Sequence, residues 1–125
     1  MNNQDAFNRI WRHFVVDKQP LSTNSELGSC YYRHPETGAK CAVGILIPDD
    51  QCPPDIDNGH WPLTRVSAEV PALRGCSIQF LRAVQNTHDS AAFAVSRGDQ
   101  PHLERDLRNI AGRFNLVAPA EGAPV

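Results

Sequence analysis

The stretch from residue 30 to residue 48 reads CYYRHPETGAKCAVGILIP, and it predicts a β-hairpin. Residues that favour strands flank a loop that contains Pro35 and Gly38, the residue types expected in a hairpin connection. Pro48 ends the second strand, because proline has no backbone N–H to donate to a ladder. This hairpin is the expected centre of the fold.

The turn also predicts the register of the two strands. If residues 35–38 form a four-residue loop, His34 lies opposite Ala39 and Tyr32 lies opposite Cys41. Side chains alternate between the two faces of a strand. The core face then holds Cys30, Tyr32, Cys41, Val43, Ile45 and Ile47. The other, wetter face holds Tyr31, Arg33, Lys40, Ala42, Gly44 and Leu46.

Helical signals cover most of the remaining chain. Residues 3–16 carry an apolar stripe at helical spacing, and a short helix is expected over residues 63–70. A longer helix begins after Ser77 and stops at Gly98, and the last helix covers residues 100–115.

These elements predict a single α+β domain over residues 1–117, followed by a flexible tail over residues 118–125. The domain has an N-terminal helix and a central β-hairpin, or a three-stranded antiparallel sheet that includes it. Two or three C-terminal helices pack on one face.

The composition excludes several classes of protein. Among 125 residues, 41% are hydrophobic and 21% are charged, which is ordinary for a globular domain. The net charge of −2 gives no basic excess for phosphates, so we expect no nucleic-acid partner. No apolar run is long enough for a membrane span and no signal peptide is recognisable, so we expect a cytoplasmic protein without a membrane partner. Without a recognisable secretory signal, we expect the four cysteines to be free thiols in a reducing compartment. They form no C-x-x-C pair, so we expect no metal site. No cofactor is expected.

A thiol-dependent hydrolase that uses Cys41 and His88 is one alternative for the function. Cys30 and Cys41 are expected on the core face, where thiols behave as small apolar residues. His88 falls on an apolar helical stripe and is expected to be a hydrogen-bonded core residue. Adjacent helical residues project about 100° apart, so Asp89 is not expected to orient His88. We therefore predict no catalytic residues.

The outward hairpin face offers a binding surface. Tyr31, Arg33 and Lys40 are residue types that can anchor a protein contact, stack on a base or hold a phosphate. His60 and Trp61 form a second candidate contact, unless Trp61 folds back to cover the core.

The acidic loop over residues 49–59 does not match a calcium site. An EF-hand loop needs a ligand at its fifth position, where Gly59 stands when Asp55 is counted as the first.

The chain resembles a family of small uncharacterised proteins found in bacteriophages, prophages and bacteria. The shared pattern is a Cys-x-Tyr-Arg strand, a glycine turn and a Lys-Cys-Ala-Val-Gly-x-Leu-Ile-Pro-Asp segment, followed by a helix with leucine, glutamine and His-Asp. The matching positions here are Cys30, Tyr32, Arg33, Gly38, Lys40–Gly44, Leu46–Asp49, Leu81, Gln85, His88, Asp89, Phe114 and Leu116. Ile45 departs from the pattern, since a cysteine is frequent there. No activity is established for this family, so the resemblance implies a setting and no mechanism.

This setting, together with the lack of a catalytic constellation, predicts a non-enzymatic binding protein of phage or mobile-element type. It would act as a stoichiometric inhibitor or modulator of a host protein, for instance a defence component. Besides this inhibitor and the thiol hydrolase, a third possible function is binding of a nucleotide or small signalling ligand. Such a ligand would use Tyr31, Arg33, Lys40 and the loop over residues 49–60.

Overall fold

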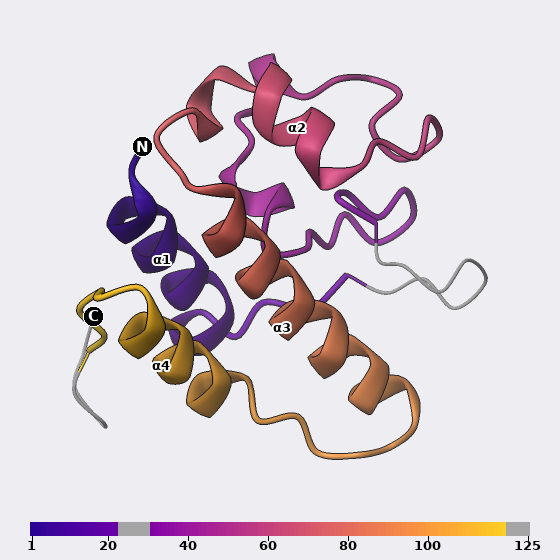
Figure 1. Ribbon diagram of the computed structural model, residues 1–125. Coiled ribbons are helices and arrows are strands. Elements are labelled where there is room, and N and C mark those ends of the chain that lie inside the picture. Colours follow the sequence, from indigo (N-terminus) through magenta and orange to yellow (C-terminus); the bar gives the residue numbers. More distant parts are fainter. Residues whose placement is uncertain (23–30, 120–125) are drawn as a thin grey trace.

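The computed structural model describes residues 1–22 and 31–119, and within these ranges the protein is built from helices (Figure 1). The four α-helices are α1 (Asn3–Trp11), α2 (Leu63–Glu69), α3 (Ile78–Ser96) and α4 (Leu103–Arg113). A turn of π-helix at Arg12–Val16 extends α1, and short 3₁₀ turns lie at Gly44–Leu46, Asp49–Gln51 and Pro71–Leu73.

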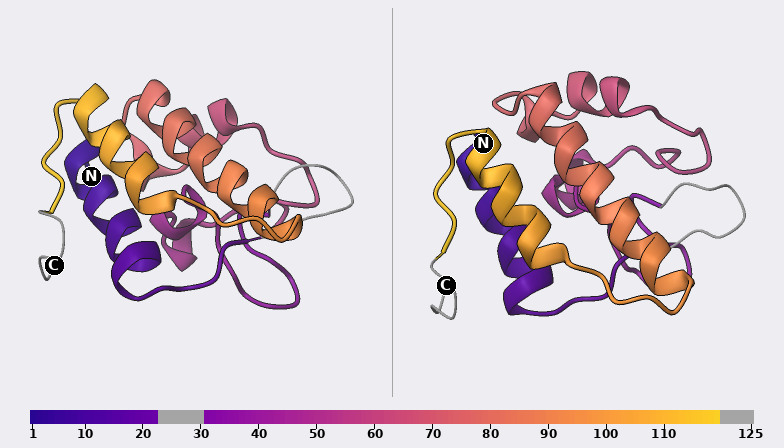
Figure 2. Two further views of the ribbon diagram at one scale, coloured as in Figure 1. Left: turned by 90° about the horizontal axis from the view of Figure 1, so that it is seen from below. Right: turned by 60° about the horizontal axis from the view of Figure 1, so that its bottom comes forward.

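Three of the α-helices pack together, and the irregular middle of the chain covers the rest of the core. α1 and α4 lie side by side, and α3 packs against α4 (Figures 1 and 2). α2 packs on α3, and the turn at Gly44–Leu46 contacts α1. The side chains fully buried between these elements include Phe7, Ile10, Leu46, Phe80, Leu81 and Leu107.

The helix boundaries follow local signals in the sequence. Ser77 Oγ accepts a hydrogen bond from the backbone N–H of Phe80 and caps α3, and Gly98, with a φ of +77°, follows its last turn. Asn2 and Asp5 each cap the backbone N–H of the other at the start of α1. The helices predicted near residues 3–16, 63–70, 77–98 and 100–115 are therefore confirmed.

The predicted α+β fold is wrong, because the described residues contain no β-sheet. The hairpin begins in the expected register: the N–H of His34 donates to Ala39 O at 2.7 Å, and the N–H of Cys41 donates to Tyr32 O at 3.4 Å. This pairing remains an isolated bridge. Neither the central hairpin of regular strands nor a three-stranded sheet is present in the part of the chain that the structure describes.

After Cys41 the chain turns helically and does not continue as a strand. The N–H of Ile45 donates to Cys41 O at 3.1 Å, and the N–H of Leu46 donates to Val43 O at 3.0 Å. The run from residue 42 to residue 47 is apolar throughout, and a short apolar run is compatible with either a buried strand or a buried helical turn.

The predicted separation of the hairpin faces is also wrong beyond Cys41. Ala42, Gly44 and Leu46, which the alternation assigns to the wetter face, are buried, whereas Ile45 is only partly buried. A helical turn does not send successive side chains to opposite faces, so a period of two does not apply here. Cys30, the first residue of the predicted core face, lies outside the described ranges.

Gly44 lies where two segments of backbone touch. A Cβ atom at this position would lie 2.1 Å from the carbonyl oxygen of Tyr32. The absence of a side chain therefore lets the turn at Gly44–Leu46 pack directly against residue 32.

The last described residues pack on α1. The side chain of Gln4 donates to Val117 O at 3.0 Å and accepts from the N–H of Val117 at 2.8 Å. The Arg108 guanidinium donates to Pro119 O. Most of the predicted flexible tail, residues 118–125, lies outside the described ranges, and its flexibility stays a prediction.

We expect Gly44→Ala to lower the free energy of unfolding by about 1–3 kcal/mol, because the added methyl group overpacks the contact with Tyr32. Gly112→Ala is the matched control: it lies within α4, and no atom lies within 4 Å of a Cβ built there. That control should raise stability by about 0.5–1 kcal/mol. Urea unfolding followed by circular dichroism measures both changes, and an unchanged midpoint for Gly44→Ala would contradict the close backbone contact.

Candidate functional site

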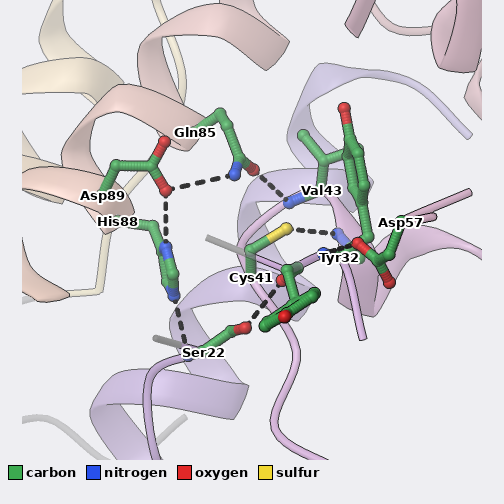
Figure 3. Close-up of polar contacts among 10 residues, drawn as sticks. Ser22, Tyr32, Cys41, Val43, Asp57, Gln85, His88 and Asp89 are labelled. Atoms are coloured by element: carbon green, nitrogen blue, oxygen red, sulfur yellow. Dashed lines mark hydrogen bonds and ion pairs between the residues drawn. The ribbon is translucent and has the colours of Figure 1, made fainter. Parts of the chain in front are cut away.

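A chain of polar contacts connects α3 to the irregular segment (Figure 3). His88 is 1% exposed, and its Nε2 accepts a hydrogen bond from the backbone N–H of Ser22 at 3.1 Å. Because Nε2 is an acceptor, a neutral ring carries its proton on Nδ1, which lies 3.0 Å from Asp89 Oδ1. The prediction that His88 is a hydrogen-bonded core residue is confirmed.

The expectation that Asp89 cannot orient His88 is wrong. Neighbouring residues project about 100° apart on a helix, but rotation about their side-chain bonds brings the two groups together here. The same Asp89 oxygen accepts from Gln85 Nε2 at 3.2 Å, and Gln85 Oε1 accepts from the backbone N–H of Val43 at 3.0 Å. These three side chains of α3 therefore hold the chain at Ser22 and at Val43.

The Cys41 thiol is enclosed in the core. It is 0% exposed, and its Sγ accepts a hydrogen bond from the backbone N–H of Gly44 at 3.3 Å. Burial raises the pKa of Cys41 to about 12, despite the opposing effect of that hydrogen bond and of Gln85. The prediction that Cys41 serves as a small core residue is confirmed, while the same prediction for Cys30 lies outside the described residues.

The Asp57 carboxylate holds the start of the hairpin-like segment, residues 32–41 (Figure 3). Its two oxygens accept from the backbone N–H of Tyr32 at 2.7 Å and from the backbone N–H of Arg33 at 3.1 Å. The Tyr32 hydroxyl in turn donates to Trp61 O at 3.2 Å, and burial raises the pKa of Tyr32. One carboxylate on the loop that precedes α2 thus fixes two adjacent residues that are far away in the sequence.

Arg33 is half-buried and already has partners. Its Nη1 lies 2.7 Å from Asp49 Oδ1, and its Nη2 donates to Ile47 O at 2.8 Å. The side chain is 25% exposed, whereas the side chain of Asp49 is 86% exposed. The guanidinium therefore ties the hairpin-like segment to the residues that follow the Gly44–Leu46 turn.

A hollow of about 370 Å³ opens between these segments. Its lining includes Tyr31, Arg33, Asp49, Asp57 and Asn58, together with Cys52 and three prolines. The Tyr31 ring makes an edge contact with the His34 ring, with 5.0 Å between the ring centroids. We take this hollow as the candidate binding site, because it joins exposed polar groups and an aromatic ring in one depression.

The other predicted site residues lie apart from this lining. Lys40 lies near His13, where burial first and then the Lys40 charge lower the pKa of His13. His60 is exposed, in the left-handed region with a φ of +50°. Trp61 is 8% exposed and belongs to the core, which confirms the interpretation that it folds back. Arg65 lies 3.6 Å from the centroid of the Trp61 ring and covers it.

Sequence analysis grouped the loop over residues 49–60 with Tyr31 and Arg33 as an alternative ligand site, and the structure does bring them together around the hollow. It did not single out Asp49, Asp57 or Asn58 within that loop. No local signal links Asp57 to Tyr32, because the contact joins residues 25 positions apart. Only the high density of aspartates and prolines marked the loop as unusual. Within the described residues, no group of three or more His, Cys, Asp or Glu side chains is arranged to hold a metal ion.

A second hollow, of about 430 Å³, lies along α3 and α4. Arg82 and Arg113 line it with Asp106 and several uncharged polar side chains. It contains none of the residues that sequence analysis selected.

Comparisons with known proteins add no relative. No family model matches the chain, and no curated protein or solved structure is significantly similar to it. The resemblance to the phage and prophage family therefore stays a prediction. None of the described helices is long and apolar enough to cross a membrane.

We expect Asp57→Asn to lower the free energy of unfolding by roughly 1.5–3 kcal/mol, because an amide can accept from only one of the two backbone N–H groups and carries no charge. Asp50→Asn is the control, since Asp50 is exposed and lies in the same acidic loop. Chemical unfolding of the two variants makes the comparison. Equal stability would mean that the Asp57 contacts contribute little.

We also expect stability to fall as the pH rises above about 9. Burial raises the pKa of Cys41 from 9.0 to about 12 and raises that of Tyr32, so the folded protein retains protons that the unfolded chain loses. Where the unfolded chain binds fewer protons, the free energy of unfolding decreases with pH. Unfolding midpoints near neutral pH and at about pH 10 should differ less for Cys41→Ala than for the unmodified protein. An identical loss in both would rule out the contribution of this thiol.

Proposed function

We propose that the protein is a non-enzymatic binding protein of phage or mobile-element type. It acts in the host cytoplasm as a stoichiometric inhibitor or modulator of a host protein, for instance a component of a defence system. The observation that carries this proposal is the contrast between two sets of residues. Cys41 and His88 are occupied inside the fold, whereas the hollow beside Tyr31 is lined by partly or fully exposed polar side chains and one aromatic residue.

The burial and hydrogen bonds of Cys41 and His88 argue against the thiol hydrolase. A nucleophilic cysteine needs an accessible thiolate, but the Cys41 thiol is 0% exposed and burial raises its pKa to about 12. A general base needs a free acceptor, but His88 Nε2 accepts from Ser22 and its other ring nitrogen contacts Asp89. Neither group can reach a substrate without rearrangement of the core.

The charges of the hollow argue against the nucleotide alternative. A phosphate needs an accessible cation whose charge is not already paired, but the Arg33 guanidinium pairs with Asp49 and donates to Ile47 O, and its Nε, which has no partner, is buried. Asp49 and Asp57 would repel a phosphate in this lining, and Lys40 does not belong to it. A surface for a protein partner remains, and binding by contact alone needs no reacting group.

Tyr31 is the residue on which we expect this contact to depend most. Tyrosine is enriched among the residues that dominate protein interfaces, because it supplies a large area with little loss of conformational freedom. Tyr31 lines the hollow and is partly exposed, and its ring contacts the ring of His34.

The test is capture of host proteins by the tagged full chain, followed by affinity measurement with the purified partner. We expect a partner at a fixed stoichiometry, bound at least roughly fivefold more weakly by Tyr31→Ala. Phe93→Ala is the matched control, because Phe93 is an aromatic side chain on α3 that is 62% exposed and does not line the hollow. The proposal fails if no stoichiometric partner is found, or if Phe93→Ala weakens the complex and Tyr31→Ala does not.

A further inference from the structure

The lining of the hollow has a negative charge balance. Arg33 supplies its positive charge, and Asp49 pairs with that guanidinium at 2.7 Å. Asp57 faces two backbone N–H groups, which are neutral, so its carboxylate charge is not balanced by a cation. The lining therefore carries one negative charge more than it carries positive charges.

Both carboxylates keep acceptor capacity. An ionised carboxylate offers about four lone-pair positions. Asp57 uses two of them for Tyr32 and Arg33, and Asp49 uses one for Arg33 while its side chain stays 86% exposed. A donor that enters the hollow from outside can therefore bond to either group without displacing a contact of the fold.

The remaining lining suits a flat cation on an apolar stem. Tyr31 lines the hollow, and its ring makes an edge-to-face contact with the ring of His34. The negatively charged face of an aromatic ring attracts cations. Pro53 and Pro54 give the lining apolar surface for methylene groups.

We propose that the hollow binds the guanidinium group of an arginine side chain on the partner protein. This inference rests on the function proposed above and specifies the chemistry of the contact. A guanidinium has five donors in a plane, so it can stack on Tyr31 while it donates to Asp49 or Asp57. A lysine ammonium has no plane to stack and is more strongly hydrated, so it binds more weakly. A phosphate would be repelled by the two carboxylates of the lining, Asp49 and Asp57.

The test uses nuclear magnetic resonance of the full-length, ¹⁵N-labelled protein, with four separate probes: hexa-arginine, hexa-lysine and hexa-glutamate peptides, and ATP. Hexa-arginine should shift the amide signals of Arg33, Asp49 and Asn58, and hexa-lysine should shift them with a several-fold weaker affinity. Hexa-glutamate and ATP should leave them unchanged. Shifts at these amides with ATP, or equal affinities for the two basic peptides, would overturn the inference.

Variants separate the hollow from general attraction to an acidic loop. Asp49→Asn removes one charge but keeps an acceptor for Arg33, and should weaken hexa-arginine binding roughly fivefold to tenfold. Tyr31→Leu should weaken it roughly twofold to fivefold. Asp50→Asn removes the neighbouring exposed charge, which does not line the hollow, and should change the affinity less than twofold, within about experimental error. Equal losses for Asp49→Asn and Asp50→Asn would contradict a specific site.

The same variants distinguish the two proposals. If the captured host protein binds Asp49→Asn as tightly as the unmodified chain but loses affinity for Tyr31→Ala, the arginine contact is wrong and the binding function stands. If no stoichiometric host partner exists, both proposals fail.

Discussion

Residues 31–62 lie against the helical core without a sheet to pair their backbone, so side chains from distant parts of the chain provide the partners. The Asp57 carboxylate accepts from the N–H groups of Tyr32 and Arg33, and Gln85 accepts from the N–H of Val43. A buried N–H group without a partner costs about 1–3 kcal/mol, so these few contacts restrict where the segment can lie. The turn at Gly44–Leu46 and the hollow beside Tyr31 are positioned by them.

The same constraint explains why Cys41 and His88 are occupied inside the fold and do not line the hollow. A histidine, an aspartate and a cysteine suggest a reaction when they are seen only in a sequence. In this fold His88 accepts from Ser22, Asp89 orients His88 and Gln85, and Cys41 accepts from Gly44. Each group stabilises an irregular backbone, and each would have to release it before it could act on a substrate. The chemistry available for binding is therefore that of the loop over residues 49–58 and of Tyr31.

The sequence predicted those parts of the fold that depend on local interactions. Ser77 caps α3, Gly98 follows it, and the apolar stripe of α1 faces the core, because these features depend on residues within one or two turns. The start of the hairpin was predictable for the same reason, since a four-residue loop sets the pairing of His34 with Ala39. Its continuation was not predictable. After Cys41 the N–H of Val43 bonds to Gln85, and before it the N–H groups of Tyr32 and Arg33 bond to Asp57. Neither contact has a signal in the local sequence. The grouping of Tyr31 and Arg33 with the loop over residues 49–60 was predicted as an alternative site, but which acidic side chains of the loop line the hollow was not, because those contacts position the loop.

One consequence concerns the exchange of backbone hydrogens with solvent. The amides of Tyr32, Arg33 and Val43 are each held by a side chain of another segment, so they are shielded although no ladder surrounds them. Their protection does not reflect the separation of strands. It reports instead how often the loop that carries Asp57, or the face of α3 that carries Gln85, releases this part of the chain. Because the two anchors belong to different elements, the exchange of Tyr32 and Arg33 reports on the loop, whereas the exchange of Val43 reports on α3.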